Sequence, residues 1–164
     1  MTTAADGSGG LPAARSGRRH TIVPHTADAG LRMVAPSLAT LFEEAAVALS
    51  AFTADRGVGV PPSIWEDVRL EAGDLPGLAY AWLNELVALG DIHHGAVLEA
   101  SVVGVDRRTD ASPDGSWRLR ARIGLAPYAT NGPRPRRGVK SATFHRLAVV
   151  RRGHGWTMRA YLDV

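Results

Sequence analysis

The feature that most constrains the fold is one long run of apolar residues at helical spacing. It begins after Asp74 and continues to Leu89. The members of this stripe recur every three or four positions: Leu75, Leu78, Ala79, Trp82, Leu83, Leu86 and Leu89. Asp74 is suited to cap the first turn, and Pro76 fits within that turn. A one-sided stripe of this length predicts an amphipathic helix that buries Trp82 at the centre of the domain.

A second stripe of the same kind lies earlier in the chain. It predicts a helix capped by Ser37, with Glu43 and Glu44 facing water. The apolar positions of this helix are Leu38, Leu41, Phe42, Ala45, Ala46 and Leu49. Alternating patterns predict strands over residues 20–23, 29–34, 64–71, 97–105, 117–125, 139–151 and 156–164. This order of elements predicts the α+β class, with a largely antiparallel sheet and two packed helices.

The length and composition fit a single domain. The chain has 164 residues, of which 45% are hydrophobic, which is ample for a core. We expect residues 1–18 to form a disordered tail and residues 19–164 to form the domain. No stretch approaches the roughly 18 apolar residues of a membrane span, and no apolar run follows Arg18 and Arg19 as a signal peptide requires. The expected location is the cytoplasm, without a membrane partner.

The lack of cysteine narrows the possible chemistry. It excludes disulfides, thiol nucleophiles and thiolate metal sites, so a metal must be held by oxygen or imidazole. One candidate set joins Asp28, in an early turn, with Asp163 and the terminal carboxylate of Val164. Carboxylates this close repel unless a cation compensates, and hard oxygen donors suit Ca²⁺ or Mg²⁺ better than Zn²⁺. Most aspartates at turns and chain ends are only solvated or capping, so the pattern alone leaves both interpretations open.

The histidines suggest a different kind of site. His25, near Asp28, and the distant His145 could form a zinc site or an acid–base pair. No two histidines have a recognised ligand spacing, however, and structural or surface roles are favoured. The sequence also has no G-x-S-x-G nucleophile elbow and no glycine-rich phosphate loop. The residues therefore predict no catalytic centre.

A basic run lies in a segment that is predicted to be a loop, residues 126–138. It contains Arg134, Arg136 and Arg137, and Lys140 follows it. Such runs are usually solvated, and the functional alternative is docking of a phosphate or an acidic protein patch. Lys and Arg exceed Asp and Glu by 19 to 16, which permits an RNA or acidic partner without requiring one. Aromatic residues make up only 6% of the chain, which does not favour a base-stacking RNA-binding module.

Five segments occur in the order that one known family shows. They read HTADAGLRM (25–33), SLATLFEEAAVALS (37–50), WLNELVAL (82–89), VKSATFHRLAV (139–149) and GWTMRAYLDV (155–164). With these segments the chain resembles the archease family. Together they cover about residues 20–164, and the family ends at the same Asp-plus-aliphatic pair. The resemblance therefore implies the archease fold over this range.

The resemblance also implies a function. Archeases are non-enzymatic protein cofactors of RtcB-type RNA ligases, which use GTP and Mn²⁺ to join a 3′-phosphate or 2′,3′-cyclic phosphate end to a 5′-hydroxyl. They promote guanylylation and multiple turnover of the ligase in tRNA splicing or RNA repair, so RNA would be reached only through the ligase. The family's divalent-cation site, typically calcium, maps to Asp28, Asp163 and Val164. The implied flanking or partner-contact residues are His25, Lys140, His145, Arg134, Arg136 and Arg137. Lys140 and His145 are five residues apart on one strand, so both reach one site only across a bulge or bend.

The chain departs from the family pattern in one loop. Family members often carry Gly-Glu, then an Asp and an Arg-His pair, where this chain has Leu125-Ala126, Ala129 and Gly132-Pro133, so the loop acids are missing. A further difference lies outside this loop, where Ala81 replaces a frequent Asp. These differences would weaken metal binding or alter the partner surface. Two other functions stay open: a small metal-dependent phosphoester hydrolase that uses His25 or His145, and a chaperone-like binding module with an apolar patch.

Overall fold

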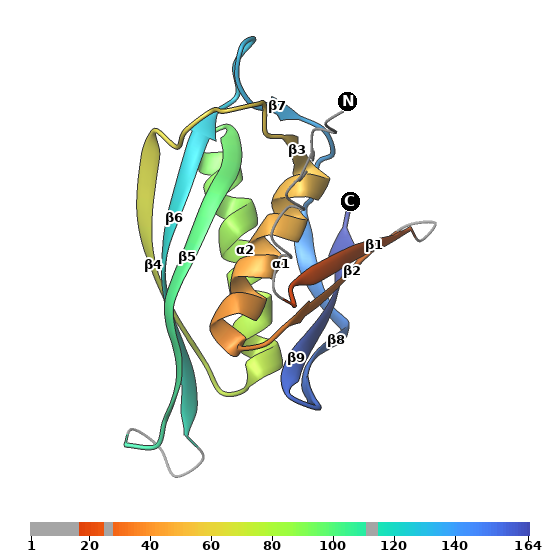
Figure 1. Ribbon diagram of the computed structural model, residues 1–164, viewed down its shortest axis with the longest axis vertical. Helices are drawn as coiled ribbons and strands as arrows, with labels where there is room; N and C mark the ends of the chain where they lie inside the picture. Colours follow the sequence, from red (N-terminus) through yellow and green to blue (C-terminus); the bar gives the residue numbers. More distant parts are fainter. Residues whose placement is uncertain (1–16, 25–27, 111–114) are drawn as a thin grey trace, which may run out of the picture.

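A computed structural model describes residues 17–24, 28–110 and 115–164 of the chain. Two helices form a middle layer between two antiparallel sheets (Figure 1). The four-stranded sheet has the order β1-β2-β9-β8, and the three-stranded sheet has the order β4-β6-β5. The strands are β1 (Arg19–Pro24), β2 (Asp28–Ala35), β3 (Ala54–Asp55), β4 (Ile64–Ala72), β5 (Gly95–Arg108), β6 (Ser116–Pro127), β7 (Arg134–Pro135), β8 (Ser141–Arg152) and β9 (Gly155–Asp163). The α+β class and the largely antiparallel pairing are therefore confirmed.

Both helices begin at the predicted caps. The Ser37 side chain accepts a hydrogen bond from the Thr40 amide at the start of α1 (Leu38–Thr53). The Asp74 side chain accepts one from the Gly77 amide at the start of α2 (Leu75–Ile92), with Pro76 in the first turn. These bonds satisfy amide groups that have no partner within the helix.

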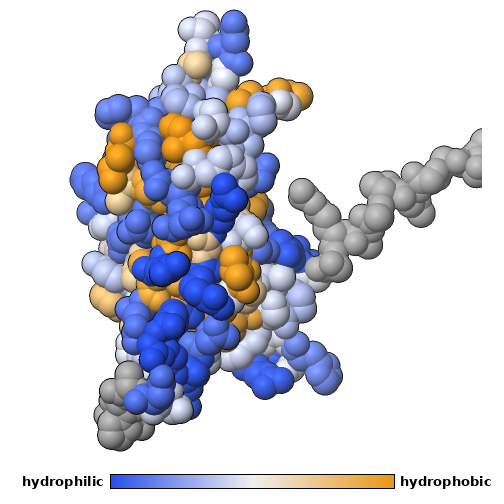
Figure 2. All heavy atoms as spheres, turned by 90° about the vertical axis from the view of Figure 1, so that its left-hand side faces the viewer, coloured by the Kyte–Doolittle hydropathy of each residue, from blue (hydrophilic) through white to orange (hydrophobic). Residues whose placement is uncertain are grey.

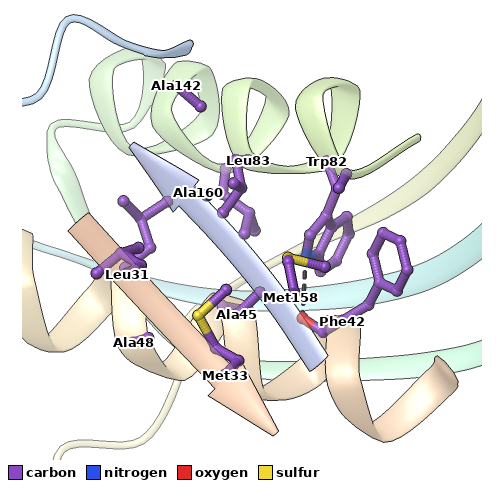
Figure 3. Packing of buried hydrophobic residues seen from close by; sticks show 14 of the residues in the cluster. Leu31, Met33, Phe42, Ala45, Ala48, Trp82, Leu83, Ala142, Met158 and Ala160 are labelled. Carbon is purple, nitrogen blue, oxygen red and sulfur yellow. Dashed lines mark hydrogen bonds between the residues drawn. The ribbon is translucent and has the colours of Figure 1, made fainter. Parts of the chain in front are cut away.

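Trp82 lies at the centre of the shared core, as the stripe predicts. Its side chain is fully buried, and its Nε1 donates a hydrogen bond of 2.9 Å to the Phe42 carbonyl oxygen of α1. Figure 3 shows Met158 of β9 beside the Trp82 ring and Met33 of β2 near Ala45, and all four residues belong to one cluster. Residues from both sheets and both helices belong to this one cluster, so the two sheets share a single core.

The prediction that Glu43 and Glu44 face water is wrong. Glu44 is buried and its carboxylate contacts Nδ1 of His20 in β1. Glu43 accepts a 3.0 Å hydrogen bond from the Val102 amide, where β5 shifts register against β6. The reason is the layer arrangement: a helix between two sheets has little solvent-facing surface, so even its polar face meets strands.

Three smaller features complete the fold. The segment expected to be a loop contains β7, which pairs with the unpredicted two-residue strand β3. The tail expected over residues 1–18 falls outside the described residues except for its last two, of which Arg18 pairs with Glu43 at 2.9 Å. In the described part of the chain, no helix combines the length and apolar character that crossing a membrane requires.

Candidate metal site and partner surface

Three segments that are distant in sequence meet at one end of the four-stranded sheet. Asp28, the first residue of β2, is the register partner of Asp163 near the end of β9. Ser141, the first residue of β8, is the register partner of Asp163 on its other side. The Lys140 amide also donates a 2.9 Å hydrogen bond to the Asp163 carbonyl oxygen. The two aspartates that the motifs link therefore occupy neighbouring positions, where Cβ atoms are typically about 5 Å apart.

The surroundings of Asp163 are partly open. Asp163 is half-buried and Val164 is 46% exposed. Among the residues whose side chains the structure describes, which do not include Asp28, no three His, Asp or Glu side chains gather as a metal cluster. His25 also lies outside the described residues. The backbone arrangement thus brings together Asp28, Lys140 and Asp163. Which of their atoms would bind a metal stays a prediction.

A large bulge in β8 places His145 differently from its position in a regular strand. Between Thr143 and Ala148, β8 advances five residues while β9 advances only from Tyr161 to Arg159. This is the kind of irregularity that Lys140 and His145 would need to share a site. The His145 ring lies 5.9 Å from that of Tyr161, edge to face. Tyr161 is two residues before Asp163, so His145 lies beside the candidate site rather than within a described ligand cluster.

The three arginines of the basic run lie elsewhere, near the C-terminal ends of both helices. The amides of Arg136 and Arg137 both donate to the Thr53 carbonyl oxygen, at 2.8 and 3.3 Å. The Arg137 guanidinium lies 5.2 Å from the centre of the Phe52 ring. Arg134, in β7, bonds the Thr130 carbonyl oxygen at 3.2 Å. The segment from Arg134 to Lys140 therefore links the helix ends to Asp163.

A cavity of about 360 Å³ opens beneath this segment. Its walls include apolar residues of both helices and the linking segment, among them Leu49, Leu86, Val87 and Val139. Polar residues at the cavity are Ser50, Thr53, Asp91, His94, Tyr128, Arg136 and Arg137. Burial and the charge of Asp91 raise the pKa of Tyr128, so its hydroxyl stays neutral and can donate a hydrogen bond. A cavity that combines apolar walls with polar groups can receive a small ligand or a side chain of a partner.

One residue that organises this region was not among the candidate site residues that the sequence suggests. The Asn84 side chain on α2 accepts a 2.9 Å hydrogen bond from the Ala142 amide and lies 3.4 Å from the Ala142 carbonyl oxygen. The Asn84 side chain thus bonds the backbone of the edge strand β8 much as a neighbouring strand would, two residues after Lys140. Asparagine is a weak helix former, and its place in the middle of a strongly helical segment was the available signal.

The missing loop acids also have a structural explanation at one position. Ala126 is buried with Ala54, Ala96 and Leu98 in a small apolar cluster beside β5. A carboxylate at that position would be buried without a partner, which is costly. The departure from the family pattern is therefore compatible with the local packing.

The fold and the site define the class of protein. It is a small α+β domain in which two sheets enclose two helices, with a candidate oxygen-donor site at the end of one sheet. The sequence profile of the archease protein family matches residues 20–164. The chain therefore belongs to the archease family.

Individual relatives agree with this assignment. Protein archease of Pyrococcus furiosus is 30% identical, with 85% of this chain and 94% of that protein covered. Protein archease of Pyrobaculum neutrophilum is 29% identical, with 85% and 91% covered. The solution structure of a Methanobacterium thermoautotrophicum protein superimposes with a TM-score of 0.69 at 25% identity, covering 88% of this chain and 98% of that one. A Thermotoga maritima crystal structure, described as an archease and possible chaperone, has a TM-score of 0.53 at 15% identity, covering 87% and 94%, and supports the fold alone.

Proposed function

We propose that this protein is a non-catalytic cofactor of an RtcB-type RNA ligase, and that Asp28, Asp163 and Val164 hold a divalent cation at the contact. The observation that carries the proposal is the pairing of Asp28 with Asp163 across β2 and β9. Membership of the archease family supports the ligase as the partner. In this role the protein promotes guanylylation and repeated turnover of the ligase in tRNA splicing or RNA repair, in the cytoplasm.

The donor set fits a hard cation. Carboxylate oxygens at neighbouring strand positions are the ligands that Ca²⁺ and Mg²⁺ prefer. A bound cation supplies positive charge that offsets the repulsion between the carboxylates. The Lys140 amide donates a hydrogen bond to the Asp163 carbonyl oxygen, and the Asn84 side chain accepts one from the Ala142 amide, two residues after Lys140. These two bonds orient the site, with the Lys140 side chain exposed beside it for a carboxylate or phosphate of the partner.

Calcium binding is tested by thermal unfolding. At a free calcium concentration about 100-fold above the dissociation constant, binding adds roughly 2.7 kcal/mol, which corresponds to a Tm increase of about 5–10 °C. Asp163→Asn should abolish the shift. Asp67→Asn, on the exposed face of β4, is the matched control and should keep it. A Tm that does not change in saturating calcium contradicts the site.

The role as ligase cofactor is tested by transfer of labelled GTP to the purified ligase. Asp28→Asn and Asp163→Asn should lose the stimulation of guanylylation while retaining the folded far-UV spectrum, and Asp67→Asn should stimulate normally. Full stimulation by folded Asp163→Asn would move the ligase contact away from the metal site, and the Arg134–Arg137 segment would be the next surface to test. Hydrolysis of phosphoesters by the protein alone would favour the metal-dependent hydrolase instead.

The cavity favours a second candidate, a chaperone-like binding module. Its apolar walls and the rim that carries Arg136 and Arg137 suit an apolar side chain of a client with acidic neighbours. Val87→Trp would fill the cavity without touching Asp163. If this variant fails to protect an aggregating client yet still stimulates the ligase, the two activities use different surfaces. If it loses neither activity, the binding-module function is excluded.

A further inference from the structure

The outer face of the four-stranded sheet carries several exposed arginines. Register places Arg19 of β1, Arg32 of β2 and Arg159 of β9 on this face, and the exposed Arg146 lies beside Arg159 in the β8 bulge; these four residues are here called the arginine band. Arg32 and Arg159 are register partners, and Arg19 and Arg32 line one hollow. The Arg159 Nε donates to the Arg146 carbonyl oxygen at 3.4 Å. With strands about 4.8 Å apart, the band crosses roughly 14 Å of the sheet.

No acid of the described chain neutralises this band. Among the residues that the structure describes, none of the four arginines forms an ion pair with a carboxylate. Like charges directly opposite on neighbouring strands destabilise a sheet, and Arg32 faces Arg159 in this way. In Figure 1 both helices lie on the other side of the sheet, and no described element covers the outer face. A ligand with repeated negative charges would remove the repulsion.

The other sheet provides an internal contrast. Its central strand β6 also exposes alternate arginines, but each has an acid beside it. Arg118 is the register partner of Glu71 and Asp106, and Arg122 is the partner of Asp67. Arg120 is the register partner of Arg69, a like-charge pair similar to Arg32 and Arg159, but Arg120 also lies 3.7 Å from Asp106. An arginine on an exposed strand is therefore not by itself unusual in this protein. The arginine band differs because its charges have no described compensation.

The surroundings of the band favour a nucleic acid over an acidic protein. Protein-binding surfaces usually have an apolar centre, whereas the register positions beside the band hold Thr21 and Ala148. The nearby Phe144 is 60% exposed, but it stacks on Tyr80 of α2 with the ring centres 3.9 Å apart. Nucleic-acid surfaces are more polar and more positive, and the planar guanidinium suits phosphate. In the next row of the sheet the half-buried Tyr161 ring contacts His145 edge to face, and the exposed His145 ring is one on which a base could lie.

We propose that the arginine band binds the phosphate backbone of single-stranded nucleic acid directly. This differs from the expectation that RNA is reached only through the ligase. The band lies on different residues from the Asp28–Asp163 site, so the proposal stands independently of the metal and of the ligase. It gives the protein a second, electrostatic contact whose strength depends on salt.

The test is fluorescence anisotropy of a labelled oligouridylate of about 16 nucleotides with the full chain, in EDTA and without ligase. The expected wild-type result is binding that weakens as salt rises from about 50 to about 200 mM. Arg32→Gln with Arg159→Gln should weaken binding at least about tenfold and lower the slope of log K against log salt by about 1.4, from two lost phosphate contacts. The matched control, Arg118→Gln with Arg120→Gln, removes the same charge and should change affinity less than about twofold, as expected for a face outside the contact.

Three results would overturn the proposal. The first is absence of wild-type binding at the lower salt concentration. The second is an equal loss in both double variants, which would indicate attraction to net charge rather than to the band. The third is equal affinity for poly-glutamate of matched charge, which would make an acidic protein segment the occupant. Circular dichroism of both double variants establishes that a loss of binding is not a loss of fold.

Discussion

On the outer face of the three-stranded sheet each arginine of β6 lies beside a carboxylate, including Arg120, whose register partner is Arg69. On the four-stranded sheet Arg32 lies beside Arg159, and neither forms an ion pair with a described carboxylate. Figure 2 shows the first of these faces, where hydrophilic residues predominate and apolar residues lie in separate groups. Both faces come from the same strand pattern, with alternate residues exposed. The difference arises from the partner strands. Arginines that are paired with carboxylates keep a face solvated. Arginines without such partners produce a positive potential that attracts a negatively charged ligand.

The two sheets also share one core, which limits how far they can behave separately. Trp82→Ala should lower the free energy of unfolding by roughly 3–5 kcal/mol, because it removes a fully buried indole between the sheets. Urea unfolding followed by circular dichroism measures the loss. Trp65→Ala, on the outer face at 44% exposure, is the control and should cost less than about 1 kcal/mol. In Trp82→Ala, protection of backbone amides from hydrogen exchange should fall in both β6 and β9. A fall in only one of these strands would show that the sheets unfold as separate units.

The edge of the four-stranded sheet depends on a side chain rather than on another strand. Asn84→Ala should cost about 1–3 kcal/mol, because it leaves the buried Ala142 amide without its acceptor. Asn84→Asp keeps that acceptor and should cost less. The loss of hydrogen-exchange protection should be concentrated in β8 and spare β5. Equal costs for the two variants would mean that the bond to the Ala142 amide is not the stabilising contact.

The smallest effect tests the charge contrast itself. Arg32→Glu should stabilise the protein by about 0.2–1 kcal/mol, because it places an acid opposite Arg159. Arg118→Glu should destabilise it by a similar amount, because it places an acid between Glu71 and Asp106. Denaturant midpoints at low salt measure both changes, and added salt should shrink them. Changes of the same sign would show that the two faces do not differ in their local electrostatics.

Much of the fold was accessible from local sequence pattern. The two helices, their caps at Ser37 and Asp74, and the burial of Trp82 follow from apolar spacing and capping chemistry, and all are confirmed. The solvent exposure of Glu43 and Glu44 was mispredicted because periodicity describes the faces of one helix and not what packs against them. The same limit hid the division of the strands into two sheets.

The candidate site divides in the same way. The motifs around Asp28 and Asp163 suggested a link between two distant segments, but their register across β2 and β9 is a property of the assembled sheet. The role of Asn84 at Ala142 joins α2 to β8 across 58 positions of sequence. Contacts of this kind depend on which strands pair, and strand pairing is a non-local choice that residue spacing does not encode.

The sequence by itself determined the α+β class, the start of each helix, the central tryptophan and the absence of thiol chemistry, because each depends on neighbouring residues or on composition alone. The tertiary structure decided that the helices lie between two sheets, that Asp28 stands opposite Asp163, and that Arg32 faces Arg159 while Arg118 faces Glu71. The reason is electrostatic as well as geometric. The energy of a charge depends on its neighbours within a few ångströms, and those neighbours are chosen only when distant strands come together.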